Sequence, residues 1–165
     1  MNDTPTQRWP IHPPQLRPQY NPNLIALRFS NLDWPGVSQA ISAYSNSWVN
    51  HVDIAVSDKT MVSVFPPVVQ ELNYDSLPTA RSEWRYLKCT PNQRLKAEAF
   101  AKAQVGKLYN LPGLALFPLQ LGIEWPGGWF CSELVAAALV HAGIVRLDKR
   151  SANVSPHDLY RLTSR

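Results

Sequence analysis

Two runs of alternating apolar residues, 50–56 and 61–65, constrain the fold of this chain most strongly, and the polar turn Ser57-Asp58-Lys59-Thr60 separates them. The aliphatic residues recur at every second position: Val52, Ile54 and Val56 in the first run, Val62 and Val64 in the second. Because successive side chains of a strand point to opposite faces, this pattern predicts a β-hairpin whose valine face lies in the core.

The same alternation places three polar residues on the other face of the hairpin. His51 and Asp53 share that face on the first strand, and Ser63 lies on the same side of the second strand. The pattern does not fix the register between the strands, so contact between His51 and Ser63 stays open. Asp53 stands two positions along the strand from His51 and is expected to point awkwardly for it.

A cysteine stands at the predicted start of a helix, in the sequence GGWFCSELV at residues 127–135. Apolar residues continue with helical spacing from Leu134 to Ala142, and Gly143 suits the left-handed position that ends a helix. The N–H groups and dipole at a helix N-terminus favour the thiolate of Cys131, the nucleophilic form. The alternative is a small core residue, because Cys131 lies on the apolar side of this helix.

The remaining pattern predicts an α+β fold, an antiparallel sheet packed against helices. We expect strands at 24–29 and 84–89 and a helix at 35–44. Thr90 and Gln93 form a Thr-x-x-Gln capping box with Pro91 in the first turn, which predicts a helix that Gly106 ends. The apolar face of this helix is expected at Leu95, Ala99, Phe100 and Ala103.

Proline separates the chain into two parts. Six of the 15 prolines fall within residues 1–22, which predicts an extended N-terminal arm that packs on the domain or docks on a partner. Residues 23–165 have the length of a single domain. The arm has no apolar segment of the signal-peptide kind, so we expect synthesis in the cytoplasm, with export by another route left open.

Composition excludes several classes of protein. Two cysteines, Cys89 and Cys131, are too few for a disulfide scaffold or a four-cysteine zinc site, although one bridge between them stays open. A net charge of +4 without a basic block argues against nucleic-acid binding. The apolar stretch 111–123 is too short and proline-broken to span a membrane. The oligomeric state stays open.

The other candidate residues carry less specific signals. His12, His141 and His157 lack metal-ligand spacing, so we expect no metal and no other cofactor. Glu133 is expected to be a helix-start acid rather than a catalytic one, and Cys89 to pack. Tyr109 and Gln120 are candidates for the lining of a cleft.

The order of histidine and cysteine resembles a known family. A strand histidine followed 80 residues later by a helix-start cysteine is similar to the circularly permuted branch of the NlpC-like papain-fold superfamily, where the histidine comes first. The segments HVDIAVSD at 51–58, FCSELV at 130–135 and SPHDL at 155–159 look like its histidine strand, nucleophile helix and closing segment. Lecithin:retinol acyltransferase-like proteins share this layout. The resemblance covers roughly residues 23–162.

The resemblance implies a papain-like fold with Cys131 as nucleophile and His51 as general base. The backbone N–H of Cys131 would help to stabilise the oxyanion. The family orients its histidine from the next strand, usually with His, Glu, Gln or Asn, and the matching position here is Ser63. A serine brings no charge and a short reach, so this departure bears on full activity.

Three functions remain open at this level. The leading one is a cysteine amidase or peptidase that works through an acyl-enzyme, on peptide substrates that include peptidoglycan. The second is a lipid acyl hydrolase or acyltransferase, for which the stretch 111–123 would form an apolar wall beside the cleft, suited to an acyl chain. The third is a binding or assembly module that keeps the fold without efficient catalysis, the function that Ser63 favours.

Overall fold

The computed structural model describes residues 18, 21–32, 45–77, 79, 81–111, 119 and 127–163. Nearly all of the predicted arm, the predicted helix 35–44 and most of the stretch 111–123 lie outside these residues. The fold below is that of the described part of the chain.

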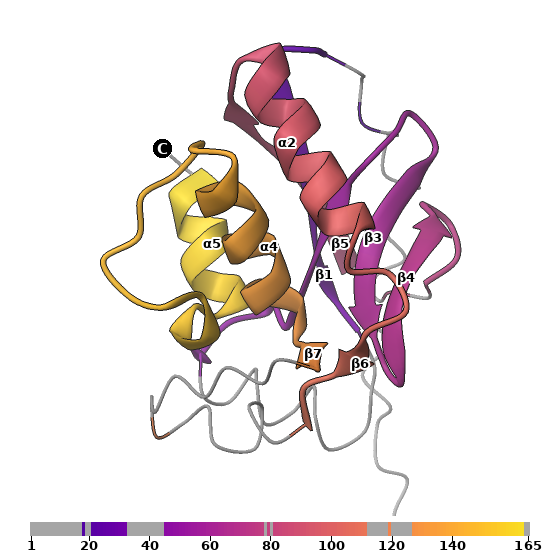
Figure 1. The fold of residues 1–165 in the computed structure, drawn as a ribbon. Coiled ribbons are helices and arrows are strands. Elements are labelled where there is room, and N and C mark those ends of the chain that lie inside the picture. Colours follow the sequence, from indigo (N-terminus) through magenta and orange to yellow (C-terminus); the bar gives the residue numbers. More distant parts are fainter. Residues whose placement is uncertain are drawn as a thin grey trace, which may run out of the picture.

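A mainly antiparallel sheet forms the centre of the molecule (Figure 1). Its strands are β1 (Leu24–Asn31), β2 (His51–Ala55), β3 (Thr60–Phe65), β4 (Val68–Asn73), β5 (Arg81–Lys88), β6 (Leu108–Tyr109) and β7 (Gly128–Trp129). They are ordered β5-β1-β2-β3-β4-β6-β7, and within this sheet β6 and β7 form the parallel pair. Strands β4, β6 and β7 were not predicted, whereas β2 and β3 fall where the alternation placed them. Strand β1 runs two residues beyond the predicted range 24–29, and β5 begins three residues before the predicted range 84–89 and ends at Lys88.

Three helices lie together on one side of this sheet: α2 (Pro91–Lys102), α4 (Cys131–His141) and α5 (Pro156–Thr163) (Figure 1). Helix α4 lies between the other two and contacts both, and the short 3-10 helix η2 (Ser151–Asn153) connects it to α5. The expected α+β class with helices against a mainly antiparallel sheet is therefore confirmed.

The hairpin has the two faces that the sequence predicts. Its valine face joins the main core beneath the helices, with Val52, Ile54, Val56, Val62 and Val64 all buried. The opposite face carries a second, smaller apolar cluster around Met61, Ala55 and Tyr74. Polar residues are buried between the apolar ones on this second face, and they include His51, Asp53 and Ser63.

Helix α2 starts as predicted but buries a different face. Thr90 is its N-cap, and the capping box with Gln93 is present. The helix ends at Lys102, four residues before Gly106, and Leu95 on the predicted apolar face is 61% exposed. The buried positions are Arg94, Ala97, Glu98 and Ala101. The small alanine side chains let α2 approach α4 closely, and the Arg94–Glu98 ion pair offsets the cost of burying two charges.

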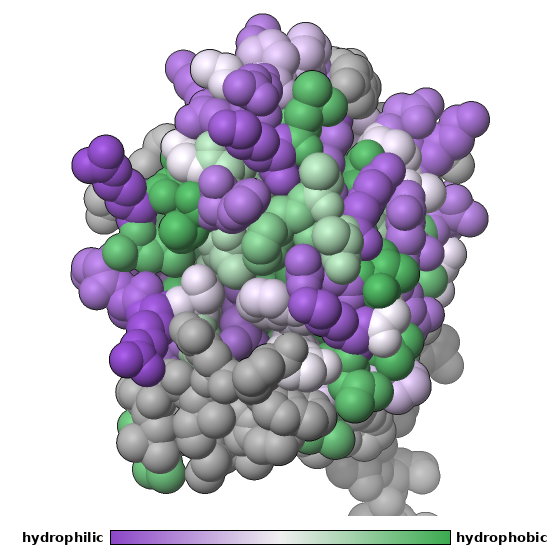
Figure 2. All heavy atoms as spheres, viewed as in Figure 1, coloured by the Kyte–Doolittle hydropathy of each residue, from purple (hydrophilic) through white to green (hydrophobic). Residues whose placement is uncertain are grey.

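Helix α4 begins at Cys131 itself, and Gly143 ends it with a φ of 68°. The N–H of Ile144 donates to the Leu139 carbonyl and that of Gly143 to the Val140 carbonyl, a Schellman motif. On the face seen in Figure 2, hydrophobic side chains show in the centre, over α4 and the adjoining part of α2, between hydrophilic edges. None of the described helices is long and apolar enough to cross a membrane.

Candidate active site

The start of β2 and the start of α4 bring the candidate residues together. His51 is the first residue of β2 and pairs with Ser30 near the end of β1. Strand β7 leads through Phe130 directly into α4, whose first residue is Cys131. Both starts lie at the end of the sheet that is lowest in Figure 1.

Cys131 is held at the helix start by its neighbours. The side chain of Cys131 is buried, and Glu133 accepts the backbone N–H of Phe130 through Oε2 at 3.2 Å. The same oxygen accepts the side-chain amide of Asn110 at 3.3 Å. Because Cys131 is the first helical residue, its own N–H has no acceptor within the helix. An N–H donor at this place in the chain is suited to stabilising an oxyanion.

His51 contacts two oxygens through one ring nitrogen. Its Nε2 lies 2.7 Å from Oδ1 of Asp53 and 3.1 Å from Oγ of Ser63. The expectation that Asp53 points awkwardly is wrong, because the carboxylate reaches back along the strand and is the nearer partner. Ser63 does share the His51 face, as the alternation predicted. Both contacts use Nε2, and neither uses Nδ1, the other ring nitrogen.

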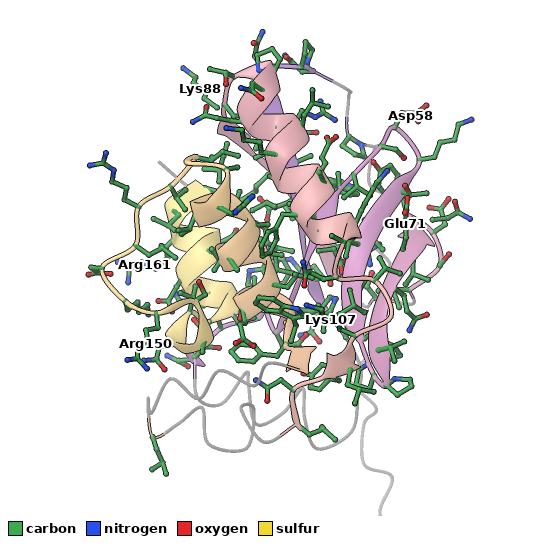
Figure 3. All side chains as sticks on the ribbon, in the orientation of Figure 1. Asp58, Glu71, Lys88, Lys107, Arg150 and Arg161 are labelled. Carbon is green, nitrogen blue, oxygen red and sulfur yellow. The ribbon has the colours of Figure 1, made fainter. Side chains whose placement is uncertain are left out.

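A buried arginine holds the far side of Asp53. Nε of Arg28 lies 3.1 Å from Oδ2 of Asp53, and the side chains of both residues are at most 5% exposed. By contrast, charged residues such as Glu71, Lys88 and Arg150 lie at the outside of the molecule (Figure 3). Sequence reasoning missed Arg28, although a charged residue between Leu27 and Phe29 in an otherwise apolar strand was a usable signal.

The surroundings of His51 favour its charged form. Burial alone lowers the pKa of the imidazole, but the Asp53 carboxylate and then Cys131, through charge and side-chain hydrogen bonds, raise that pKa to about 10. His51 is therefore an imidazolium at neutral pH. Helix α4 packs against β2, and the charge of Cys131 is one of the causes that raise this pKa.

Asp53 and Tyr109 respond to the same group of charges. Burial raises the pKa of the Asp53 carboxyl, yet His51 and Arg28 outweigh burial and lower it overall. Burial, with the charge of Cys131 as a second cause, raises the pKa of Tyr109. Tyr109 lies in β6, next to the strand that leads to Cys131, so it borders the candidate site, whereas Gln120 lies outside the described residues.

The other predicted candidates lie elsewhere. His157 contacts Ser47 Oγ at 3.0 Å, and His141 packs beside the ring of Phe100 at the far end of α4. Both cysteines are free thiols, which excludes the alternative of a Cys89–Cys131 bridge. Cys89 packs against the main core, and His12 lies outside the described residues.

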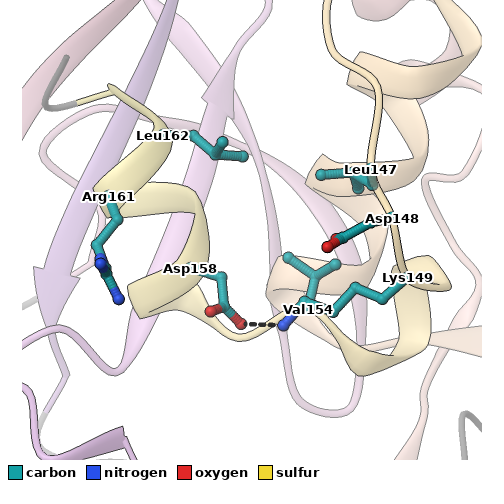
Figure 4. Close-up of a pocket in the computed structure, with 7 residues that line it drawn as sticks. All are labelled: Leu147, Asp148, Lys149, Val154, Asp158, Arg161 and Leu162. Atoms are coloured by element: carbon teal, nitrogen blue, oxygen red, sulfur yellow. Dashed lines mark hydrogen bonds and ion pairs between the residues drawn. The ribbon is translucent and has the colours of Figure 1, made fainter.

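A surface pocket of about 390 Å³ lies between α5 and the segment that follows α4 (Figure 4). Its wall includes Val154, Arg161 and the Lys149–Asp158 ion pair of 2.8 Å. Asp158 also accepts the N–H and hydroxyl of Ser155 at the start of α5, so the helix start accounts for its position. The pocket contains neither Cys131 nor His51. Among the described residues, no three His, Cys, Asp or Glu side chains gather in a way that could hold a metal ion.

The site consists of the buried Cys131 thiol and the His51 imidazolium, which the Asp53 carboxylate contacts. This set can supply a nucleophile, a proton donor and an oxyanion donor within one short region of the fold. No family model matches the sequence, and a comparison with curated proteins finds no significant relative.

Proposed function

We propose that this protein is a cysteine hydrolase of the permuted NlpC-like papain type, which cleaves an amide bond through an acyl-enzyme on Cys131. One observation carries the proposal: Nε2 of buried His51 contacts the Asp53 carboxylate at 2.7 Å, on a strand that packs against the helix beginning at Cys131. A packed structural cysteine needs neither an imidazolium nor a buried carboxylate behind it. The order of histidine strand and cysteine helix supports the permuted arrangement.

In the proposed reaction the Cys131 thiolate attacks the amide carbonyl, and the carbonyl π electrons move to oxygen. The backbone N–H of Cys131 donates to this oxyanion. As the C–N bond breaks, the His51 imidazolium protonates the leaving amine and becomes neutral. Neutral His51 then takes a proton from water, and the hydroxide attacks the thioester. The C–S bond breaks, the acid leaves, and the Cys131–His51 ion pair is restored.

Asp53 takes the orienting role that the family resemblance assigned to Ser63. Its contact to His51 is shorter, 2.7 Å against 3.1 Å, and it brings a full negative charge. Ser63 is among the groups that lower the pKa of the Asp53 carboxyl. With a carboxylate as the nearer partner of His51, the reason for favouring a weakly catalytic module is reduced.

A lipid acyl hydrolase or acyltransferase is the second candidate, because apolar side chains are exposed next to Tyr109. Leu108 is 49% and Leu111 56% exposed, and both lie within two residues of Tyr109. Such a surface suits an acyl chain beside the thiol, and the same acyl-enzyme chemistry would serve an ester.

The first experiment measures alkylation of Cys131 by iodoacetamide in a Cys89→Ser background, so that Cys131 is the one thiol that can be alkylated. At pH 6 we expect a rate at least about tenfold above that of glutathione, because in the proposed pair the His51 imidazolium favours the thiolate. His51→Ala is expected to remove this excess, whereas the matched variant His141→Ala leaves it. Ordinary thiol kinetics that do not depend on His51 would overturn the proposal.

Substrate assays then separate the candidate functions. Release of free amines from purified peptidoglycan or from a peptide library supports the amidase, and release of fatty acid from phosphatidylcholine vesicles supports the lipid enzyme. Cys131→Ala is the control in both assays. A fast, His51-dependent alkylation without turnover of either substrate class would leave a reactive thiol in a binding module.

A further inference from the structure

Arg28 is a buried cation on the strand next to His51. It lies on β1 directly across from Asp53 in the sheet register, and its residue exposure is 4%. Four charged or nucleophilic groups thus follow one another in space: Arg28 on β1, Asp53 and His51 on β2, and Cys131 at the start of α4.

The guanidinium is fixed at two points. Its Nε donates to Oδ2 of Asp53 at 3.1 Å, and its Nη1 donates to the backbone carbonyl of Tyr74 at 2.6 Å. Tyr74 is itself held, because its hydroxyl donates to the Ser57 carbonyl and its ring packs edge-on against Trp84 at 4.9 Å. Arg28 therefore has little freedom to move away from the carboxylate.

This arrangement is a poor way to stabilise a core. Nη2 of Arg28 is buried and has no hydrogen-bond partner among the described residues, and the same holds for Oγ of Ser30 two positions along β1. An apolar pair of similar volume often serves stability as well as a buried ion pair does. Buried charge that is only partly satisfied is typical of functional sites.

We propose that Arg28 is a positioning residue for the Cys131–His51 pair: it holds the Asp53 carboxylate so that Oδ1 faces Nε2 of His51. The proposal rests on the proposed function of the pair. Each carboxylate oxygen has one charged partner, Arg28 on Oδ2 and His51 on Oδ1. Without Arg28 the carboxylate can rotate, and it loses the positive charge that keeps it ionised beside an apolar cluster.

The effect is expected in the pH dependence of the thiol. The groups that face this site are Asp53, Arg28, the His51 imidazolium, Cys131 and the neutral phenol of Tyr109. Removing the cation leaves Asp53 easier to protonate, and a protonated Asp53 no longer supports the imidazolium. It also takes a positive charge away from the region of the thiolate. Both changes disfavour the thiolate–imidazolium pair, so the acid limb of Cys131 reactivity moves to higher pH.

The experiment compares iodoacetamide rate profiles between pH 4 and pH 9 in the Cys89→Ser background. Arg28→Gln is expected to move the acid limb up by about one pH unit, or about tenfold in rate on that limb. Arg28→Lys keeps the charge and is expected to move it by less than half as much. Arg94→Gln is the matched control, because Arg94 also gives Nε to a carboxylate and Nη1 to a backbone carbonyl within the fold.

A shift in Arg28→Gln with none in Arg94→Gln supports the proposal, and equal profiles overturn it. If instead Cys131 of the parent protein reacts like a free thiol, the proposed function fails first. The ¹⁵N spectrum of His51 then still tests Arg28, because the protected Nε2–H signal is expected to weaken in the variant. Should Arg28→Gln not fold, the same spectrum is recorded on Arg28→Lys. A lysine ammonium cannot bond Asp53 and the Tyr74 carbonyl with the planar geometry of a guanidinium, so the signal is expected to weaken there too. An unchanged signal would overturn the proposal.

Discussion

Nε2 of His51 lies 2.7 Å from Oδ1 of Asp53, two positions further along the same strand. The contact places a buried carboxylate against the imidazole. It turns a buried histidine, which burial alone would keep neutral, into an imidazolium. The candidate site therefore depends on a pair of residues from one strand rather than on a partner from the next.

Replacing Asp53 should therefore cost much more reactivity than replacing Ser63. Asp53→Asn keeps the shape but removes the charge, and we expect alkylation of Cys131 at pH 6 to fall about 100-fold or more. Ser63→Ala removes the longer contact of 3.1 Å and is expected to cost less than about tenfold. Circular dichroism at the assay temperature checks that both variants are folded. Equal losses in the two variants would return the orienting role to Ser63.

His51 also makes the stability of the fold depend on pH. Its pKa is raised from 6.5 to about 10 in the folded protein, so folding binds this proton more tightly. The contribution of His51 to the free energy of unfolding is complete below about pH 6.5 and is lost as the pH rises toward 10. One proton gives a slope of at most about 1.4 kcal/mol per pH unit. Asp53, whose pKa is lowered, stabilises the fold above the ordinary carboxyl pKa of 3.8, and this stabilisation is lost as the pH falls below that value.

The measurement is urea unfolding of Cys131→Ala and of the double variant Cys131→Ala/His51→Gln at pH 6, 7, 8 and 9, because removing the thiol excludes its own ionisation from the comparison. His141 and His157 remain in both proteins, so the difference between the two free-energy curves isolates His51. We expect that difference to shrink as the pH rises. Curves that run parallel from pH 6 to 9 would contradict the raised pKa.

Alternation and capping predicted much of the fold, because both are local signals. The two faces of the β2–β3 hairpin follow from the period of a strand, and the start of α2 follows from Thr90 and Gln93. Strands β6 and β7 have two residues each and no period, so no pattern could reveal them. The buried face of α2 was mispredicted because Arg94 and Glu98 neutralise each other, which single-residue hydropathy does not record.

For the candidate site, the sequence predicted which residue types lie on which strand or helix, but not which side chains contact one another. A histidine on a strand and a cysteine at a helix start can be read from the chain, but which side chain reaches the imidazole depends on rotamers. Asp53 was misjudged for that reason. Arg28 was missed because its partner Asp53 lies 25 residues away and only the sheet register joins them.

Glu133 is expected to be a structural support of the helix start. It is 2% exposed, and its Oε2 accepts both the Phe130 N–H and the Asn110 amide. Glu133→Ala leaves two buried donors without this acceptor, so we expect a loss of about 2–4 kcal/mol in unfolding free energy. A double-mutant cycle with Asn110→Ala should give a coupling of about 1 kcal/mol. Coupling near zero would mean that the Asn110 contact contributes nothing.

Gln93 joins the start of α2 to the end of α4, at the end of α4 opposite Cys131. Its Oε1 accepts the Thr90 N–H at 2.9 Å, and its Nε2 donates to the Gly143 carbonyl at 2.7 Å. Thr90→Ala removes the cap alone and is expected to cost about 1 kcal/mol, or a decrease of about 2–4 °C in Tm. Gln93→Glu keeps the acceptor and loses the donor, so it isolates the link to Gly143.

We expect Gln93→Glu to lower Tm at least as far as Thr90→Ala, because a carboxylate beside the Gly143 carbonyl is repelled as well as unbonded. Differential scanning calorimetry gives both values. The iodoacetamide rate of Cys131 is expected to stay unchanged in both variants, since Gly143 lies beyond the opposite end of α4 from Cys131. A rate that fell together with Tm would show that helix position, rather than the Asp53–His51 pair, controls the reactivity of the thiol.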